Sequence, residues 1–85
     1  MKEPVIAEAL AEFNRLHNRE LECTLNSVDG DGFTVRFAGT FCRTCGFHDY
    51  FDDLQILLED QYGLISAIEE ITEKQGGAEV RYLYK

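Results

Sequence analysis

The first apolar residues of the chain recur every three or four positions, the spacing at which one face of a helix is buried. These residues are Ile6, Leu10, Phe13 and Leu16. Proline suits the first turn of a helix because its missing N–H would have no intrahelical partner there. We therefore predict a helix from Pro4 to about His17, with the four apolar side chains on its buried stripe.

From Glu20 the period changes to two, which is typical of a strand with one buried face. Two runs alternate in this way: Leu21, Cys23 and Leu25, then Phe33, Val35 and Phe37. The segment Asp29-Gly30-Asp31-Gly32 between them is rich in turn-forming residues and predicts a hairpin. If Leu25 and Phe37 share a face, residue parity excludes a symmetric four-residue loop and favours a loop of three or five residues.

A second helix is predicted from Asp49 to about Gln61. Asp49 can cap it, since a carboxylate accepts the unpaired N–H groups of the first turn. Gly63 can end it in the left-handed conformation. Its apolar stripe is formed by Phe51, Leu54, Leu58 and Tyr62.

The last third of the chain has two interpretations. Residues 64–75 could form another helix, because Ile65, Ile68 and Ile71 are spaced by three. Alternatively, residues 65–73 and 78–84 form a hairpin around Gly76-Gly77, which would pair Lys74 with Glu79, Thr72 with Arg81 and Ile71 with Tyr82. We favour the hairpin. The order is then α-β-β-α-β-β, an α+β two-layer sandwich with helices on one face of a mixed or antiparallel sheet, in a single domain over residues 1–85 and without internal repeats.

Charge and composition argue against several classes of function. The chain has 16 acidic and 8 basic residues, a net charge of −8, and its basic residues are scattered. Nucleic-acid binding normally needs a basic patch, so we expect neither nucleic-acid nor anionic-membrane binding. No apolar stretch approaches the length of a membrane span. Three cysteines, two of them close together, do not form a secreted disulfide framework, so we expect a cytoplasmic protein.

The most concentrated chemistry is Cys42-Arg43-Thr44-Cys45, between a predicted strand and a predicted helix. The positive end of a helix dipole favours a thiolate over a thiol. Thiolates prefer zinc, cuprous copper or iron–sulfur clusters. Tetrahedral zinc needs four ligands. They could be Cys42, Cys45 and His48 with Asp52 or Cys23, or two cysteines from each chain of a homodimer.

These cysteines also carry a family resemblance. Val28-Asp29-Gly30-Asp31-Gly32, the following strand, Cys42-Arg43-Thr44-Cys45 and the helix after it resemble the carboxy-terminal domain of NifU-type iron–sulfur scaffold proteins, over about residues 5–72. The resemblance implies an α-β-β-α-β(β) sandwich and a non-enzymatic role. It also implies that Cys42 and Cys45 bind a labile [4Fe–4S] cluster between two subunits, for transfer to acceptor or assembly proteins.

Two other functions fit the same residues. One is a non-catalytic protein-interaction module that binds zinc or no metal, and the other is a small thiol redox protein, although the thioredoxin arrangement needs a proline near the pair and the only proline is Pro4. Cys23 is expected in the core. Asp29-Gly30-Asp31-Gly32 is expected to act as a turn, because Phe33 and Thr40 occupy positions where an EF-hand needs ligands.

Overall fold

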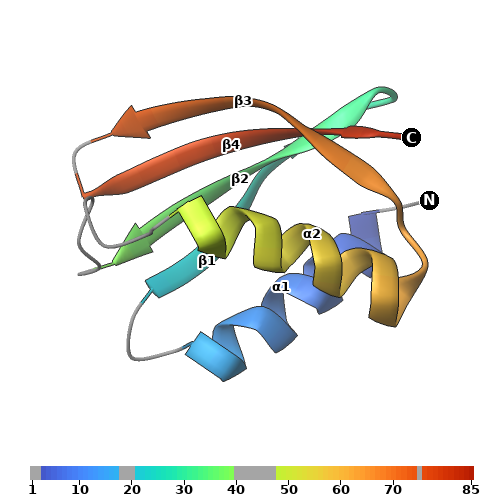
Figure 1. Ribbon diagram of the computed structural model, residues 1–85, viewed down its shortest axis with the longest axis horizontal. Coiled ribbons are helices and arrows are strands. Elements are labelled where there is room, and N and C mark those ends of the chain that lie inside the picture. The colour runs from blue at the N-terminus through green and yellow to red at the C-terminus, as the bar shows by residue number, and fades with distance from the viewer. Residues whose placement is uncertain (1–2, 18–20, 40–47, 75) are drawn as a thin grey trace.

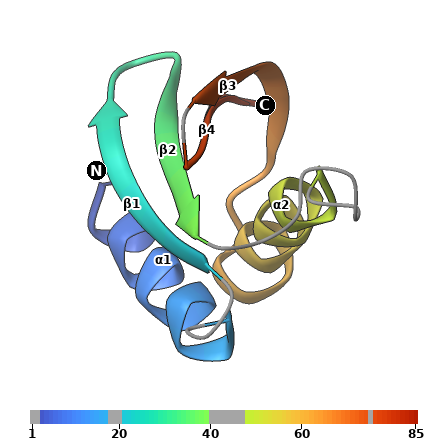
Figure 2. The same cartoon turned by 90° about the vertical axis from the view of Figure 1, so that its left-hand side faces the viewer.

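The structure, a computed structural model, describes residues 3–17, 21–39, 48–74 and 76–85. Four antiparallel strands form one sheet in the order β1-β2-β4-β3, and both helices lie on the same face of it (Figures 1 and 2). The predicted α+β sandwich is therefore confirmed, including the hairpin in the last third. The elements are α1 (Glu3–His17), β1 (Leu21–Val28), β2 (Gly32–Gly39), α2 (His48–Tyr62), β3 (Ser66–Lys74) and β4 (Gly77–Tyr84).

The core lies between the helices and the inner face of the two central strands. The largest fully buried side chains are Ile6, Phe13, Phe33, Val35, Phe37, Phe51, Leu54, Leu58, Val80 and Tyr82. They occupy the positions that the two periodicities predict, with one exception. Leu16, which the helical spacing placed on the buried stripe, is 57% exposed because it falls on the outer side of the last turn of α1.

The two halves of the fold repeat each other at an offset of 45 residues. Glu3 and His48 begin the helices, Leu21 and Ser66 the edge strands, and Gly32 and Gly77 the central strands. The central strands also share a pattern, Gly-x-x-Val-Arg-aromatic, at residues 32–37 and 77–82. The expectation that the chain has no internal repeat is therefore wrong at the level of structure. Few other residues match between the two halves, so this short pattern is the sequence evidence for the repeat.

Strands β2 and β4 meet at the centre of the sheet, where Val35 pairs with Val80. At each end of this pairing a glycine lies against the opposite backbone. A Cβ atom on Gly32 would be 2.0 Å from the carbonyl oxygen of Tyr82, and one on Gly77 would be 1.9 Å from that of Phe37. Both separations are far shorter than any van der Waals contact. Only glycine therefore permits this approach of the two central strands.

The first hairpin reaches its register through a bulge. Cys23 pairs with Phe37 and Leu25 with Val35, as the parity argument requires. Three residues, 29–31, lie between β1 and β2, a length that the parity argument predicted, although the last pair, Val28 with Phe33, has the opposite parity. The extra residue in β1, Asn26, corrects the parity and keeps Leu25 and Val28 on the same face.

A second bulge, at Glu69 in β3, explains the ambiguity of the last third. In a regular strand residues three apart face opposite sides, but the bulge lets both Ile68 and Ile71 pack against the core. A helix-like spacing therefore occurs in a strand. The predicted pairing of β3 with β4 was also wrong: Thr72 pairs with Glu79, Ile71 with Val80 and Lys74 with Gly77. Gly76, with φ of 80°, belongs to the turn, whereas Gly77 belongs to β4.

The close approach of the central strands can be tested with Gly77→Ala. We expect it to lower the free energy of unfolding in urea by about 1–3 kcal/mol, because the added methyl must push β2 and β4 apart. Gly30→Ala is the matched control, since nothing lies within 4 Å of its Cβ position. It should change stability by less than about 0.5 kcal/mol. Equal effects of the two substitutions would contradict the close-approach argument.

Candidate functional site

The predicted ligands fall at the connection between the two halves. Cys42 and Cys45 lie outside the described residues, as does the whole connection between β2 and α2, residues 40–47. The structure describes the residues on both sides of this connection. The second helix begins at His48, one residue before the predicted start and three residues after Cys45. His48, the third predicted ligand, is thus the first residue of α2.

On the strand side, the connection starts from a central strand. Gly39, the last residue of β2, donates its N–H to the carbonyl oxygen of Gly76 at 3.3 Å. This bond ties the end of β2 to the turn between β3 and β4. Because β2 is paired on both sides, the chain enters the cysteine segment from a rigid part of the sheet.

On the helix side, buried aromatic rings fix the first turns of α2. The ring of Phe51 packs edge-on against Phe37, with 4.7 Å between centroids. Tyr82, stacked on Phe33 at 4.9 Å, donates its hydroxyl to the carbonyl oxygen of Phe51 at 2.9 Å. Burial raises the pKa of Tyr82 far above its usual range, so this hydroxyl stays a donor. The start of α2 is therefore held to β4 by packing and by a buried hydrogen bond.

The electrostatics at the start of α2 favour negative charge nearby. A 15-residue helix presents unpaired N–H groups and the positive end of its dipole at its N-terminus. Asp52, the acidic residue considered as a further ligand, is exposed on this part of α2. The helix has no basic residue in its last turn.

Cys23 is not available as a ligand. Its side chain is 4% exposed in the core, as predicted. Burial, followed by the charge of Glu22, raises the pKa of the thiol from 9.0 to about 12. The side-chain amide of Asn14 also bonds both backbone groups of Cys23, accepting its N–H at 2.6 Å and donating to its carbonyl at 2.9 Å. These bonds close the outer edge of β1 at this point, where another strand could otherwise pair.

The Asp29 turn serves the fold, as predicted. The carboxylate of Asp29 accepts the N–H groups of Asp31 at 2.9 Å and Gly32 at 3.0 Å. It also accepts a bidentate pair from Arg81 at 2.8 and 3.0 Å. These bonds, the one from Arg81 foremost, lower the pKa of Asp29 from 3.8 to about 2. A calcium ion at Asp29 would have to displace Arg81 from the carboxylate. The sequence analysis had paired Arg81 with Thr72 and did not predict its contact with Asp29.

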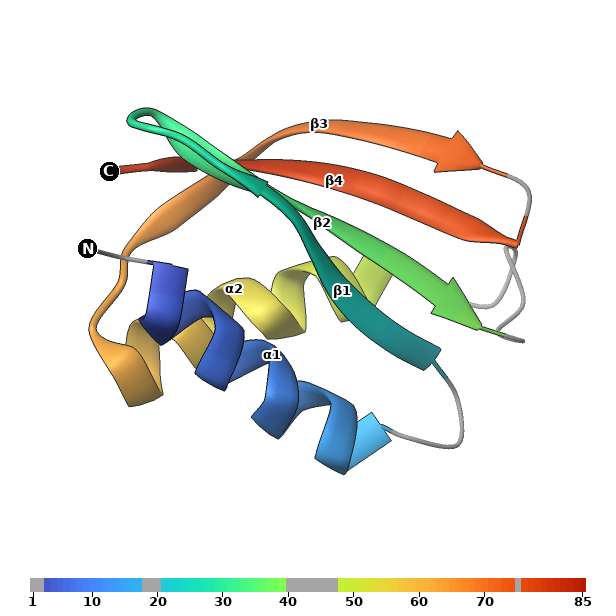
Figure 3. The ribbon, with the colours of Figure 1, turned by 180° about the vertical axis from the view of Figure 1, so that it is seen from behind.

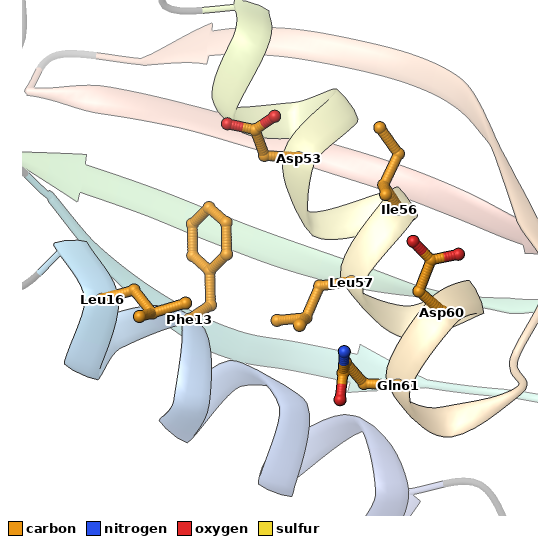
Figure 4. Close-up of a pocket in the computed structure, with 7 residues that line it drawn as sticks. All are labelled: Phe13, Leu16, Asp53, Ile56, Leu57, Asp60 and Gln61. Carbon is orange, nitrogen blue, oxygen red and sulfur yellow. The ribbon is translucent and has the colours of Figure 1, made fainter.

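The sequence analysis did not identify a groove of about 250 Å³ between the outer sides of α1 and α2 (Figure 4). Phe13 and Leu16 line it from α1, and Ile56 and Leu57 line it from α2. Its polar lining is Asp53, Asp60 and Gln61. The sequence feature that could have revealed the groove is Ile56, an apolar residue that lies off the buried stripe of its helix.

Two absences concern only the parts of the chain that the structure describes. In residues 3–17, 21–39, 48–74 and 76–85, no group of three His, Cys, Asp or Glu side chains could hold a metal ion. Neither described helix is long and apolar enough to cross a bilayer.

No family model, curated protein or solved structure matches the chain. Its function must therefore be argued from its own residues.

The burial of Cys23 predicts a large protection from thiol reagents. In the Cys42→Ser/Cys45→Ser protein, Cys23 is the only thiol. At pH 8 we expect it to react about 1000-fold more slowly in the folded protein than in urea, because a pKa near 12 instead of 9 lowers the thiolate fraction by that factor. The release of a chromophoric thiol measures both rates. Similar rates in buffer and in urea would contradict the buried placement.

The Asp29–Arg81 pair predicts an acid-dependent loss of stability. Because the folded pKa of Asp29 lies below its unfolded value, its contribution is complete above about pH 4 and is lost as the pH falls towards 2. Urea midpoints measured across this window should therefore fall less steeply for Asp29→Asn than for the wild type. Asp31→Asn is the control: it removes a carboxylate from the same turn, keeps the pair, and should retain the wild-type slope. A wild-type slope in Asp29→Asn would refute the assignment.

Proposed function

We propose that this domain is a cytoplasmic, non-enzymatic carrier or scaffold that binds an iron–sulfur cluster through Cys42 and Cys45. The observation that carries the proposal is the start of α2 at His48, three residues after Cys45. Cys45 thus lies three residues before a helix N-terminus, near which negative charge is stabilised. Low thiolate pKa values at such positions are typical of metal-binding and redox cysteines.

The number of available thiols determines the form of the site. Cys23 is buried and protonated, so each chain offers two thiolates. A [4Fe–4S] cluster takes four cysteine ligands. We therefore propose a homodimer in which each chain contributes Cys42 and Cys45. When bound, the cluster would supply the iron and sulfide that the domain passes to acceptor or assembly proteins.

The arrangement of the fold supports this proposal. The α-β-β-α-β-β order agrees with the order implied by the NifU-type resemblance. Both ends of the cysteine segment are fixed, at Gly39 by its bond to Gly76 and at Phe51 by Tyr82. Fixed ends suit a site that two chains must share, because they limit the conformations that each chain must lose on forming the cluster.

Anaerobic reconstitution with iron and sulfide tests the proposal. We expect visible charge-transfer absorption, about two irons per chain (four irons over two chains) and a dimer by size-exclusion chromatography. Cys42→Ser/Cys45→Ser should abolish all three. Cys23→Ala is the matched control, because it removes a cysteine that is not a ligand, and it should still bind the cluster.

Other results would overturn this proposal. Colourless protein carrying stoichiometric zinc would favour a zinc-dependent interaction module, and loss of that zinc in His48→Ala would identify a single-chain site. A cysteine pair that cycles between dithiol and disulfide without metal would favour a thiol redox protein. The interaction module is the second candidate, and the groove between the helices favours it.

A further inference from the structure

We propose that the groove between α1 and α2 is a docking site for a basic, amphipathic helix of a partner protein. The two helices lie side by side and run in opposite directions beneath the sheet (Figures 1 and 3). The groove lies between them, and Leu57 extends from α2 towards α1 (Figure 4). This site contains only described residues and is independent of any metal at Cys42 and Cys45.

The apolar lining of the groove exceeds what the fold requires. Ile56 is 55% exposed and Leu16 is 57% exposed. At the 45-residue offset of the two halves, Ile56 and Leu57 correspond to Ala11 and Glu12 in α1. Leu57 packs partly against the core, but Ile56 is exposed, and α1 packs against the same sheet with Ala11 in its place. The exposed Ile56 is therefore better explained by contact with another molecule.

The charged residues around the groove indicate what kind of molecule would bind there. Asp53 and Asp60 are exposed, line the groove from α2 and lie two helical turns apart, about 10 Å along its axis. At the C-terminal end of α2, burial and then the carboxylates of Glu8 and Glu12 raise the pKa of Tyr62, but Glu12 is paired with Arg15, so the acidic rim of the groove consists of Asp53 and Asp60. An apolar floor with an acidic rim fits a helix that has a leucine-type stripe flanked by lysine or arginine.

The same charges argue against a second copy of this chain as the occupant. In a two-fold dimer the same surface faces itself. Such a dimer through the groove would bring Asp53 and Asp60 of one chain against those of the other. Like charges brought together across an interface are unfavourable, and each chain carries a net charge of −8.

Two synthetic helical peptides of about 15 residues, the length of α2, can test the proposal. One has leucines at i, i+3, i+4 and i+7 with lysine elsewhere, and the other has glutamate in place of lysine. We expect the leucine–lysine peptide alone to bind, with amide chemical-shift changes along α1 and α2 centred on Leu16, Ile56 and Leu57. Added salt should weaken this binding.

Matched substitutions separate groove binding from general attraction. Ile56→Ser should weaken binding about tenfold, equivalent to 1.4 kcal/mol, whereas Ile65→Ser, at a residue of similar exposure outside the groove, should not. Asp53→Asn/Asp60→Asn and Glu22→Gln/Glu59→Gln both change the net charge from −8 to −6. Only the first pair should weaken binding markedly, by about threefold.

Several outcomes would overturn the proposal. Equal losses in the two double variants would show that the peptide follows net charge. Shifts on the exposed face of the sheet, or none with either peptide at millimolar concentration, would exclude the groove. A dimer that becomes monomeric in Ile56→Ser would show that a second copy occupies it. The same measurements on Cys42→Ser/Cys45→Ser should give unchanged affinity, so failure of the cluster proposal would not affect this one.

Discussion

The pairing of β2 with β4 is the contact on which the rest of the structure depends. Each half of the chain contributes one helix and one hairpin, and a lone hairpin is at best marginally stable. The central pairing joins the two hairpins into one sheet, with Val35 against Val80 at its middle. The missing side chains of Gly32 and Gly77 allow the backbones to approach. The inner faces then form one continuous surface that both helices can cover.

This arrangement places the cysteines at the junction of two structurally equivalent halves. The connection between β2 and α2 begins at a strand that is paired on both sides, and it ends at a helix anchored by Phe51 and Tyr82. The sheet edges, in contrast, are protected. Asn14 covers β1 at Cys23, and each edge strand contains a bulge, at Asn26 and Glu69. Edge-to-edge pairing with another chain is thus disfavoured at both edges of the sheet.

Structural features that depend on periodicity were predicted from the sequence, whereas features that depend on single residues were not. Helix and strand positions follow from buried spacings, and the N-terminus of α2 was predicted to within one residue. The register of β3 with β4 was wrong because Gly77 belongs to β4 and not to the turn, and the two bulges were not predicted because a bulge adds a residue without changing composition. Gly77 looked like a turn residue, but its role in the close approach depends on a strand 40 residues away. The Asp29–Arg81 pair and the groove were missed for the same reason, since each joins segments distant in the sequence. The two cysteines could be proposed as a site because only two residues separate them in the sequence.

The comparison of the two halves shows which apolar positions on the helices the fold needs for packing and which it does not. Positions on the inner sides of α1 and α2 are apolar in both, as with Ile6 and Phe51 or Phe13 and Leu58, because each must pack against the same kind of sheet. The outer sides differ. Where α1 has Glu12 and Arg15 in an ion pair, α2 has Leu57 and Asp60 beside an exposed Ile56. The same helix starts directly after the cysteine segment. Both features therefore lie on or next to α2, and a partner docked along α2 would contact the helix that directly follows residues 40–47.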